Sequence, residues 1–159
     1  MELISVRELF RNTAAYAGKT VTIGGWVRNR RPSKQFGFIV LNDGTYFTPV
    51  QVVYNDSISN FQEISKINVG AALVVTGELV LTPDSKQPFE ILASSIAVEG
   101  PSTGDYPLQP KRHTMEFLRT ITHLRPRTNT FQAVFRVRSL AAMAIHKFFQ
   151  ERDFVYVHT

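Results

Sequence analysis

Cationic and aromatic side chains are concentrated in the stretch GGWVRNRRPSKQFGFIVLND, residues 24–43. Its cations precede its only acidic residue, and they are Arg28, Arg30, Arg31 and Lys34. Exposed cations repel one another and contribute little to stability, so folding alone does not explain them. An anionic partner explains them better, because guanidinium groups bind phosphate and an aromatic ring such as Phe38 can stack on a base.

Acidic residues are absent from two long stretches of the chain, which has a net charge of +5 over 159 residues. The first stretch runs from Leu9 to Asn42 and the second from Phe117 to Gln150. The second contains the cations Arg119, Arg125, Arg127, Arg136, Arg138 and Lys147. A solvated positive face would explain either stretch alone. Two such stretches, with the acids elsewhere, favour a polyanion, and nucleic acid in particular, as the partner.

The composition argues against several other classes of function. The chain has no cysteine, which excludes disulfides, zinc thiolate sites and cysteine nucleophiles. The four histidines lack the spacing of metal ligands, so we expect no metal site; they are His113, His123, His146 and His158. We find no phosphate loop, nucleophile elbow or other catalytic group. No apolar run approaches the ~18 residues that span a bilayer, and we expect a cytoplasmic protein without a membrane partner.

Alternating apolar residues predict five strands, interrupted once by a helical pattern. The strands are expected at 18–31, 35–43, 47–54, 70–82 and 88–100. The helix is expected at 58–67, capped by Asp56 or Ser57, and a short N-terminal helix is capped by Ser5. This order is that of an OB fold, a mainly β, five-stranded Greek-key barrel with a helix between strands 3 and 4. OB barrels commonly bind single-stranded nucleic acid on the face of strands 2 and 3.

Side-chain alternation predicts which residues face outward. If Ile39 and Leu41 fill the barrel, Phe38 lies on the outer face, where a base can stack on it; the opposite assignment stays open. Gln51 and Glu90 each lie between apolar residues, on the third and fifth strands. The amide can donate to a base edge and accept from it, and the carboxylate can accept from base N–H groups. Plain outward-facing strand residues would show the same pattern.

The first expected strand contains the three arginines, and the side of the sheet on which each one lies depends on whether the strand is interrupted by a bulge. Arg28 and Arg30 share one side with Trp26, while Arg31 has the opposite parity unless a bulge intervenes. The pair Gly24-Gly25 predicts a bulge or a sharp bend within this strand.

After the last expected strand the chain becomes rich in proline, glycine and small polar residues, and this change predicts three parts of the chain. Residues 1–100 are expected to form the OB domain, 101–116 a linker and 117–159 the start of a second domain. A helix over about 134–150 carries an apolar stripe, which consists of Val134, Val137, Ala141, Ala144 and Phe148. RDFVYVHT then predicts a strand. A domain that ends there cannot bury the stripe, so we expect a truncated segment.

Several strings resemble one enzyme family. YPLQPKRHTMEFLRTITHLRPRTNTFQAVFRVRS closely resembles the stretch that joins the two domains of asparaginyl-tRNA synthetases, which are class IIb aminoacyl-tRNA synthetases. AIHKFFQERDFVYVHT resembles that family's motif 1, a helix and strand at the dimer interface. GWVRNRR, FGFIVLND, VQVV and FEILASSIAVEG are similar to the anticodon-binding OB domain shared with aspartyl- and lysyl-tRNA synthetases. The resemblance covers essentially the whole chain. Within it, HLRPRT favours an asparaginyl-tRNA synthetase over an aspartyl- or lysyl-tRNA synthetase.

The resemblance implies roles for individual residues in binding the anticodon loop of tRNA(Asn). In the related enzymes an aromatic residue of the second strand stacks on the central anticodon uridine, and Phe38 takes that place. Gln51 would bond to the same uridine, and Glu90 would contact the first anticodon base. Arg31 would bind the backbone or a base of the anticodon, with Arg28 and Arg30 nearby.

The resemblance also implies what the longer parent does. It would activate asparagine with ATP and magnesium and transfer it to tRNA. This segment has neither motif 2 nor motif 3, so we expect it to bind no cofactor and to be inactive alone. Its motif 1 residues would lie at a homodimer interface: Val137, Ala141, Ile145, Phe148 and Phe149. Two alternatives stay open, the N-terminal portion of an aspartyl-tRNA synthetase and a free-standing OB-fold module for single-stranded nucleic acid.

Overall fold

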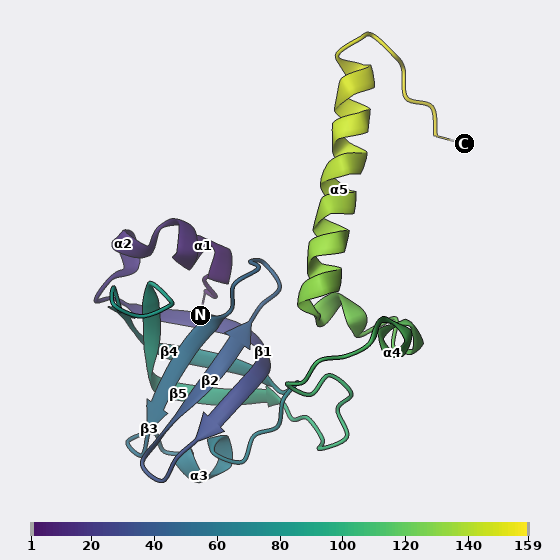
Figure 1. The fold of residues 1–159 in the computed structure, drawn as a ribbon. Coiled ribbons are helices and arrows are strands. Elements are labelled where there is room, and N and C mark those ends of the chain that lie inside the picture. The colour runs from purple at the N-terminus through teal and green to yellow at the C-terminus, as the bar shows by residue number, and fades with distance from the viewer. Residues whose placement is uncertain (1, 159) are drawn as a thin grey trace. The chain divides into compact units, whose positions relative to one another are not determined.

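A computed structural model describes residues 2–158 and divides them into two compact units, between Arg112 and His113 (Figure 1). The division falls within the stretch 101–116 that was expected to be a linker. Residues 101–112 belong to the first unit, where Tyr106 packs against the barrel core.

The first unit is a closed five-stranded barrel, which confirms the predicted OB fold. Its strands are β1 (Thr20–Pro32), β2 (Phe36–Asn42), β3 (Val50–Asn55), β4 (Ala72–Leu81) and β5 (Phe89–Gly100). Around the barrel they follow the order β1-β2-β3-β5-β4, and only the β3–β5 pairing is parallel. This order brings β3 and β5, which are distant in the sequence, side by side.

Apolar side chains from alternate strand positions fill the barrel. Ile39 and Leu41 are fully buried, as are Val52 and Ile91 on β3 and β5. Short helices cover the two ends of the barrel (Figure 1): α1 (Val6–Arg11) and α2 (Thr13–Tyr16) at one end, and α3 (Phe61–Ile64) at the other. Both α1 and α3 contribute apolar side chains to the same core.

The helix between β3 and β4 is present but much shorter than predicted. It is the single turn α3, and its N-cap residue is Asn60, so the capping predicted for Asp56 or Ser57 is wrong. The Asn55 side chain accepts from the backbone N–H of Ser57 at 3.1 Å, which holds the chain in a turn instead of a helix. At the N-terminus, by contrast, the Ser5 hydroxyl accepts from the N–H of Glu8 at 3.2 Å, so the cap predicted for α1 is confirmed.

A β-bulge interrupts the pairing of β1 with β2 between Val27 and Asn29. It does not lie at Gly24-Gly25, which pair regularly with β4, so no bulge forms at that predicted position. Gly25 is explained by a close approach of the backbone instead, because a Cβ at this position would lie 2.9 Å from the backbone oxygen of Asn42. The bulge adds one residue to β1, so the arginines beyond it change sides.

The second unit consists of helices. They are α4 (Met115–Thr120), the 3₁₀ turn η1 (Arg125–Arg127) and α5 (Asn129–Gln150). The Thr128 hydroxyl accepts from the N–H of Phe131, so α5 begins one turn before the predicted start. Residues 154–158 pair with no strand, so the strand predicted from RDFVYVHT is not formed. A strand needs ladder hydrogen bonds from a neighbouring strand, and no described segment supplies them to these residues. None of the described helices is both long and apolar enough to cross a membrane.

Candidate nucleic-acid interface

One side of the barrel carries the residues whose chemistry suits nucleic acid, and we call it the outer face. Its members lie on β1, β2, β3 and β5 and point away from the core: Arg31, Phe36, Phe38, Val40, Gln51, Val53, Glu90 and Leu92. Register places them together, because Arg31 is opposite Phe38, Phe38 is opposite Val53, and Val53 is aligned with Leu92. Paired residues on neighbouring strands share a face.

Phe38 is half-buried on this face, between the buried positions Gly37 and Ile39. The assignment that puts Ile39 and Leu41 inside and Phe38 outside is therefore confirmed. The Arg31 guanidinium carbon lies 5.2 Å from the Phe38 ring centroid, within the range of a cation–π contact. Ring and guanidinium together form a flat cationic platform of the kind on which a base can stack.

Phe36 extends this platform, and sequence reasoning did not select it. Its ring meets Phe38 edge to face, with centroids 5.6 Å apart and planes at 87°. The side chain is 45% exposed, although burying an aromatic ring of this size is favourable. Its spacing of two residues from Phe38 was the signal that could have identified it, because residues i and i+2 of a strand share a face.

Gln51 and Glu90 are joined across the parallel β3–β5 pair. The Gln51 Nε2 group donates to Glu90 Oε1 at 2.7 Å. A third side chain, Gln87 of the β4–β5 loop, donates to the same oxygen at 2.7 Å. Sequence reasoning missed Gln87, since nothing in its local pattern distinguishes it from other polar loop residues. The three polar side chains border the apolar part of the outer face beside Val53.

The bulge separates the three arginines. Arg31 reaches the outer face, while Arg30 is opposite the fully buried Ile39 and points toward the α3 end of the barrel. There its Nη1 group donates to the backbone oxygen of Ser65 at 3.0 Å. Arg28 occupies the bulge itself. A bulge does intervene, which was the stated exception to the predicted parity: Arg31 shares the outward side of β1 with Trp26, and Arg30 lies on the opposite side.

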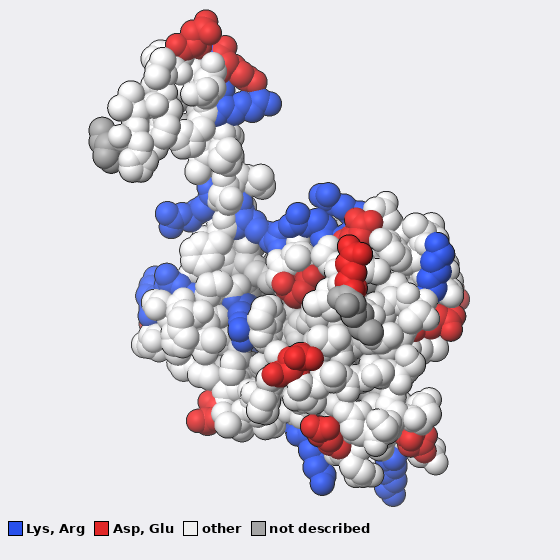
Figure 2. All heavy atoms as spheres, turned by 180° about the vertical axis from the view of Figure 1, so that it is seen from behind, with Lys and Arg blue, Asp and Glu red and all other residues white. Residues whose placement is uncertain are grey.

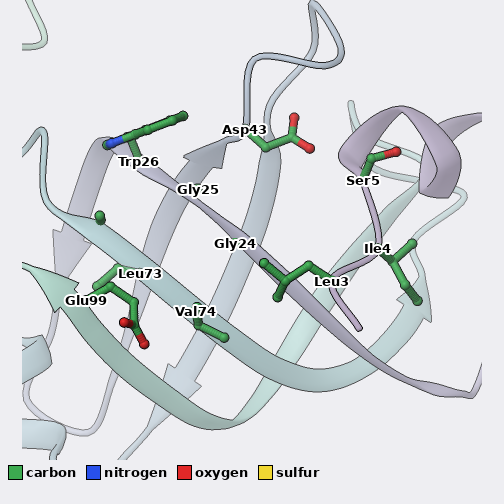
Figure 3. A pocket seen from close by; sticks show the side chains of 11 residues that line it. Leu3, Ile4, Ser5, Gly24, Gly25, Trp26, Asp43, Leu73, Val74 and Glu99 are labelled. Atoms are coloured by element: carbon green, nitrogen blue, oxygen red, sulfur yellow. The ribbon is translucent and has the colours of Figure 1, made fainter. Parts of the chain in front are cut away.

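A hollow of about 370 Å³ lies elsewhere on the barrel, between the N-terminal segment and β1 and β4. Figure 3 shows Leu3 beside the glycine pair of β1, with Trp26 at one end and Glu99 below. The carboxylate of Asp43 at its border is engaged, because Oδ2 accepts from Val6 N–H at 2.8 Å and Oδ1 from Thr45 N–H at 2.9 Å. None of the residues that the sequence selects for nucleic-acid binding lines this hollow, so we do not place the nucleic-acid site there.

The helix α5 presents an unusually apolar surface. Figure 2 shows a long uncharged section of it between the charges near its ends. Of the residues expected at a dimer interface, Val137 is 65% exposed and Ile145 59%, and Ala141, Phe148 and Phe149 are also exposed. Leu140 and Met143 are exposed as well, so the exposed apolar surface is wider than the predicted stripe. Such a helix is typical of the interior of a larger protein.

Within residues 2–158, no group of three or more His, Cys, Asp and Glu side chains could hold a metal ion.

Comparison with known proteins relates this geometry to a family. Residues 21–99 match the family described as OB-fold nucleic acid binding domain, tRNA anticodon type. Over all 159 residues, the chain is 61% identical to a protein named asparagine--tRNA ligase from Alkaliphilus oremlandii. It is 60% identical, over the same length, to one of that name from Clostridium acetobutylicum. In both comparisons the chain spans 34% of the relative's length.

Solved structures share the fold. The asparaginyl-tRNA synthetase of Pyrococcus horikoshii, complexed with asparaginyl-adenylate, matches 99% of this chain and 36% of its own with a TM-score of 0.85 at 20% identity. The aspartyl-tRNA synthetase of Entamoeba histolytica matches 100% of this chain and 39% of its own with a TM-score of 0.81 at 23% identity. At these identities the likeness concerns the fold alone. Together with the identity of about 60% along the whole chain, the matches identify a member of the asparagine--tRNA ligase family that spans about a third of its relatives' length and contains an OB-fold nucleic acid binding domain.

Proposed function

We propose that this chain recognises the anticodon of tRNA(Asn) as part of an asparagine--tRNA ligase. The observation that carries the proposal is the outer face, where an exposed aromatic platform, a guanidinium group and a paired amide and carboxylate meet on the strands of an OB barrel. Stacking groups and cations supply affinity for single-stranded RNA, and the amide and carboxylate supply base discrimination. The name that the two relatives share supports the choice of asparagine.

Each outer-face residue has a part in the proposed complex. Phe38 stacks on the central anticodon base, which is worth ~1–3 kcal/mol for base–aromatic contacts. Gln51 bonds to the edge of the same base, and Glu90 accepts from N–H groups of the first anticodon base. Arg31 can leave the Phe38 ring and bind an adjacent phosphate, because exposed cation–π contacts are worth only about 0.5–1 kcal/mol. Arg28 lies in the bulge, three residues before Arg31, and Arg30 supports the α3 end of the barrel through its bond to the Ser65 backbone oxygen.

The chemistry of the longer protein is also a proposal. It would activate asparagine with ATP and magnesium and transfer the amino acid to tRNA. The described residues show no donor set that fits magnesium, so we assign both ATP and magnesium to the part of the relatives' length that this chain does not span.

We further propose that α5 lies at a homodimer interface in the longer protein. The helix exposes Val137 and Ile145 on one side and Leu140 and Met143 on others, so two different surfaces are needed to cover it. The remainder of the catalytic domain can cover one of them and a second subunit the other. This accounts for an exposed apolar surface that is wider than one stripe.

An aspartyl-tRNA synthetase remains the nearest alternative, and its fold is the same. The names of relatives at about 60% identity favour asparagine over it. A free-standing nucleic-acid module is not favoured, since the match continues through α5 and the relatives are about three times as long.

Binding of anticodon stem-loop RNAs tests the proposal. We expect the purified chain to bind a loop with the anticodon GUU more tightly than loops with unrelated anticodons. Each phosphate that the protein neutralises contributes about −0.7 to the log–log salt slope, so three contacts would weaken binding roughly 20-fold between 50 and 200 mM salt. A matched stem-loop with the anticodon GUC distinguishes an asparaginyl-tRNA synthetase from an aspartyl-tRNA synthetase, which would prefer that loop. Equal binding to all loops, or binding independent of salt, would contradict the proposal.

A further inference from the structure

Two amide groups converge on one carboxylate oxygen at the edge of the outer face. Nε2 of Gln51 and Nε2 of Gln87 both lie 2.7 Å from Glu90 Oε1. The three residues come from β3, the β4–β5 loop and β5, and all three side chains are partly buried. No role is assigned to Gln87 by any residue pattern described above.

This convergence determines which end of the Gln51 amide faces outward. A primary amide donates only from its nitrogen and accepts only at its oxygen, and a carboxylate oxygen accepts. The NH2 end of Gln51 must therefore face Glu90, and its carbonyl oxygen Oε1 faces away from that carboxylate. Among the described residues no hydrogen bond is made to Oε1 of Gln51, so it is available as an acceptor.

Gln87 is held where it can reinforce this arrangement. The Thr82 hydroxyl donates to the backbone oxygen of Gln87 at 2.9 Å, and the Thr82 N–H donates to the oxygen of Pro88 at 3.0 Å. These bonds close the β4–β5 loop and direct the Gln87 side chain toward Glu90. Two donors on one oxygen fix the carboxylate more firmly than one, because rotating it would break both bonds.

We infer that Gln87 is a positioning residue for base recognition: together with Glu90 it locks the Gln51 carbonyl outward, so that the site selects a base with an N–H donor at the position of uracil N3. The inference rests on the proposed function. Cytosine presents a lone pair at N3, which would face the locked carbonyl oxygen and be repelled. If the amide were able to turn over, its NH2 group would bond to cytosine N3, and discrimination would be lost.

The test compares discrimination instead of affinity alone. The purified chain is titrated with two stem-loops that differ only at the central anticodon base, GUU and GCU. We expect Gln87→Met, which keeps the size of the side chain but lacks the donor, to reduce the preference for uracil over cytosine about tenfold, the size of one hydrogen bond to a charged group. Ser85→Ala, in the same loop, is the matched control and should leave the preference unchanged.

A second readout follows the amide itself. In wild-type protein the resonance of the Gln51 side-chain proton held by Glu90 should be shifted away from its position in a solvated amide, and in Gln87→Met it should move toward that position. Unchanged discrimination in Gln87→Met, with Gln51 resonances as in wild type, would overturn the role of Gln87 and leave the proposed function standing. A wild-type chain that binds both loops equally would overturn the proposed function and this inference with it.

Discussion

Replacing Phe38 by alanine separates recognition from packing, since the ring lies on the outer face and not in the core. We expect Phe38→Ala to weaken binding of the GUU stem-loop by ~1–3 kcal/mol, which is roughly 5- to 150-fold in Kd. Within the protein the ring makes an edge-to-face pair with Phe36 and lies against the Arg31 guanidinium. Pairs of these kinds contribute about 0.5–1.5 and 0.5–1 kcal/mol in addition to the partial burial of the ring, so the free energy of unfolding should fall by less than the ~3–5 kcal/mol of a core phenylalanine.

A core phenylalanine provides the control for this variant. Phe89 is only 2% exposed and belongs to the barrel core, and truncating such a residue costs about 3–5 kcal/mol. Urea unfolding and fluorescence titration with labelled RNA should be carried out on Phe38→Ala and Phe89→Ala together. If Phe38→Ala loses as much stability as Phe89→Ala, the ring is a packing residue. If it keeps its stability and also keeps wild-type RNA affinity, the stacking role is wrong.

Three further predictions follow from the arginines, the missing catalytic motifs and α5. Arg31→Ala should weaken RNA binding and lower the magnitude of the log–log salt slope of binding by about 0.7. Arg30→Ala should leave that slope unchanged and lower the free energy of unfolding by about 1 kcal/mol, because the bond to Ser65 is lost. The reverse pattern would contradict the side assigned to each arginine. The 159-residue chain should catalyse no ATP–pyrophosphate exchange with asparagine, so measurable exchange by the purified chain would refute the assignment of ATP to the rest of the protein. Ile145→Asp, on the exposed surface of α5, should reduce any self-association seen by sedimentation velocity, and association that is unaffected would show that α5 does not mediate it.

The sequence by itself determined much of the barrel. Apolar alternation put Ile39 and Leu41 on one side of the strand and Phe38 on the other, because the period of a strand is two. The burial of Ile39 and Leu41 in the structure then decided which side is inside. The order of five strands with a helical turn after the third was sufficient for the OB fold. The hydroxyl cap of α1 at Ser5 could likewise be read from neighbouring residues, since a cap depends on contacts within one helical turn.

Only the tertiary structure decided which arginine joins Phe38. The bulge between Val27 and Asn29 exists because β1 has one residue more than the facing part of β2, a mismatch between two strands that neither strand reveals alone. The same holds for the bonds of Gln51 and Gln87 to Glu90, which depend on the parallel pairing of β3 with β5 and on the closure of a loop. The prediction of a strand in RDFVYVHT was wrong for a related reason. The hydrogen bonds of a strand come from a partner segment, and the local sequence does not show whether one is present.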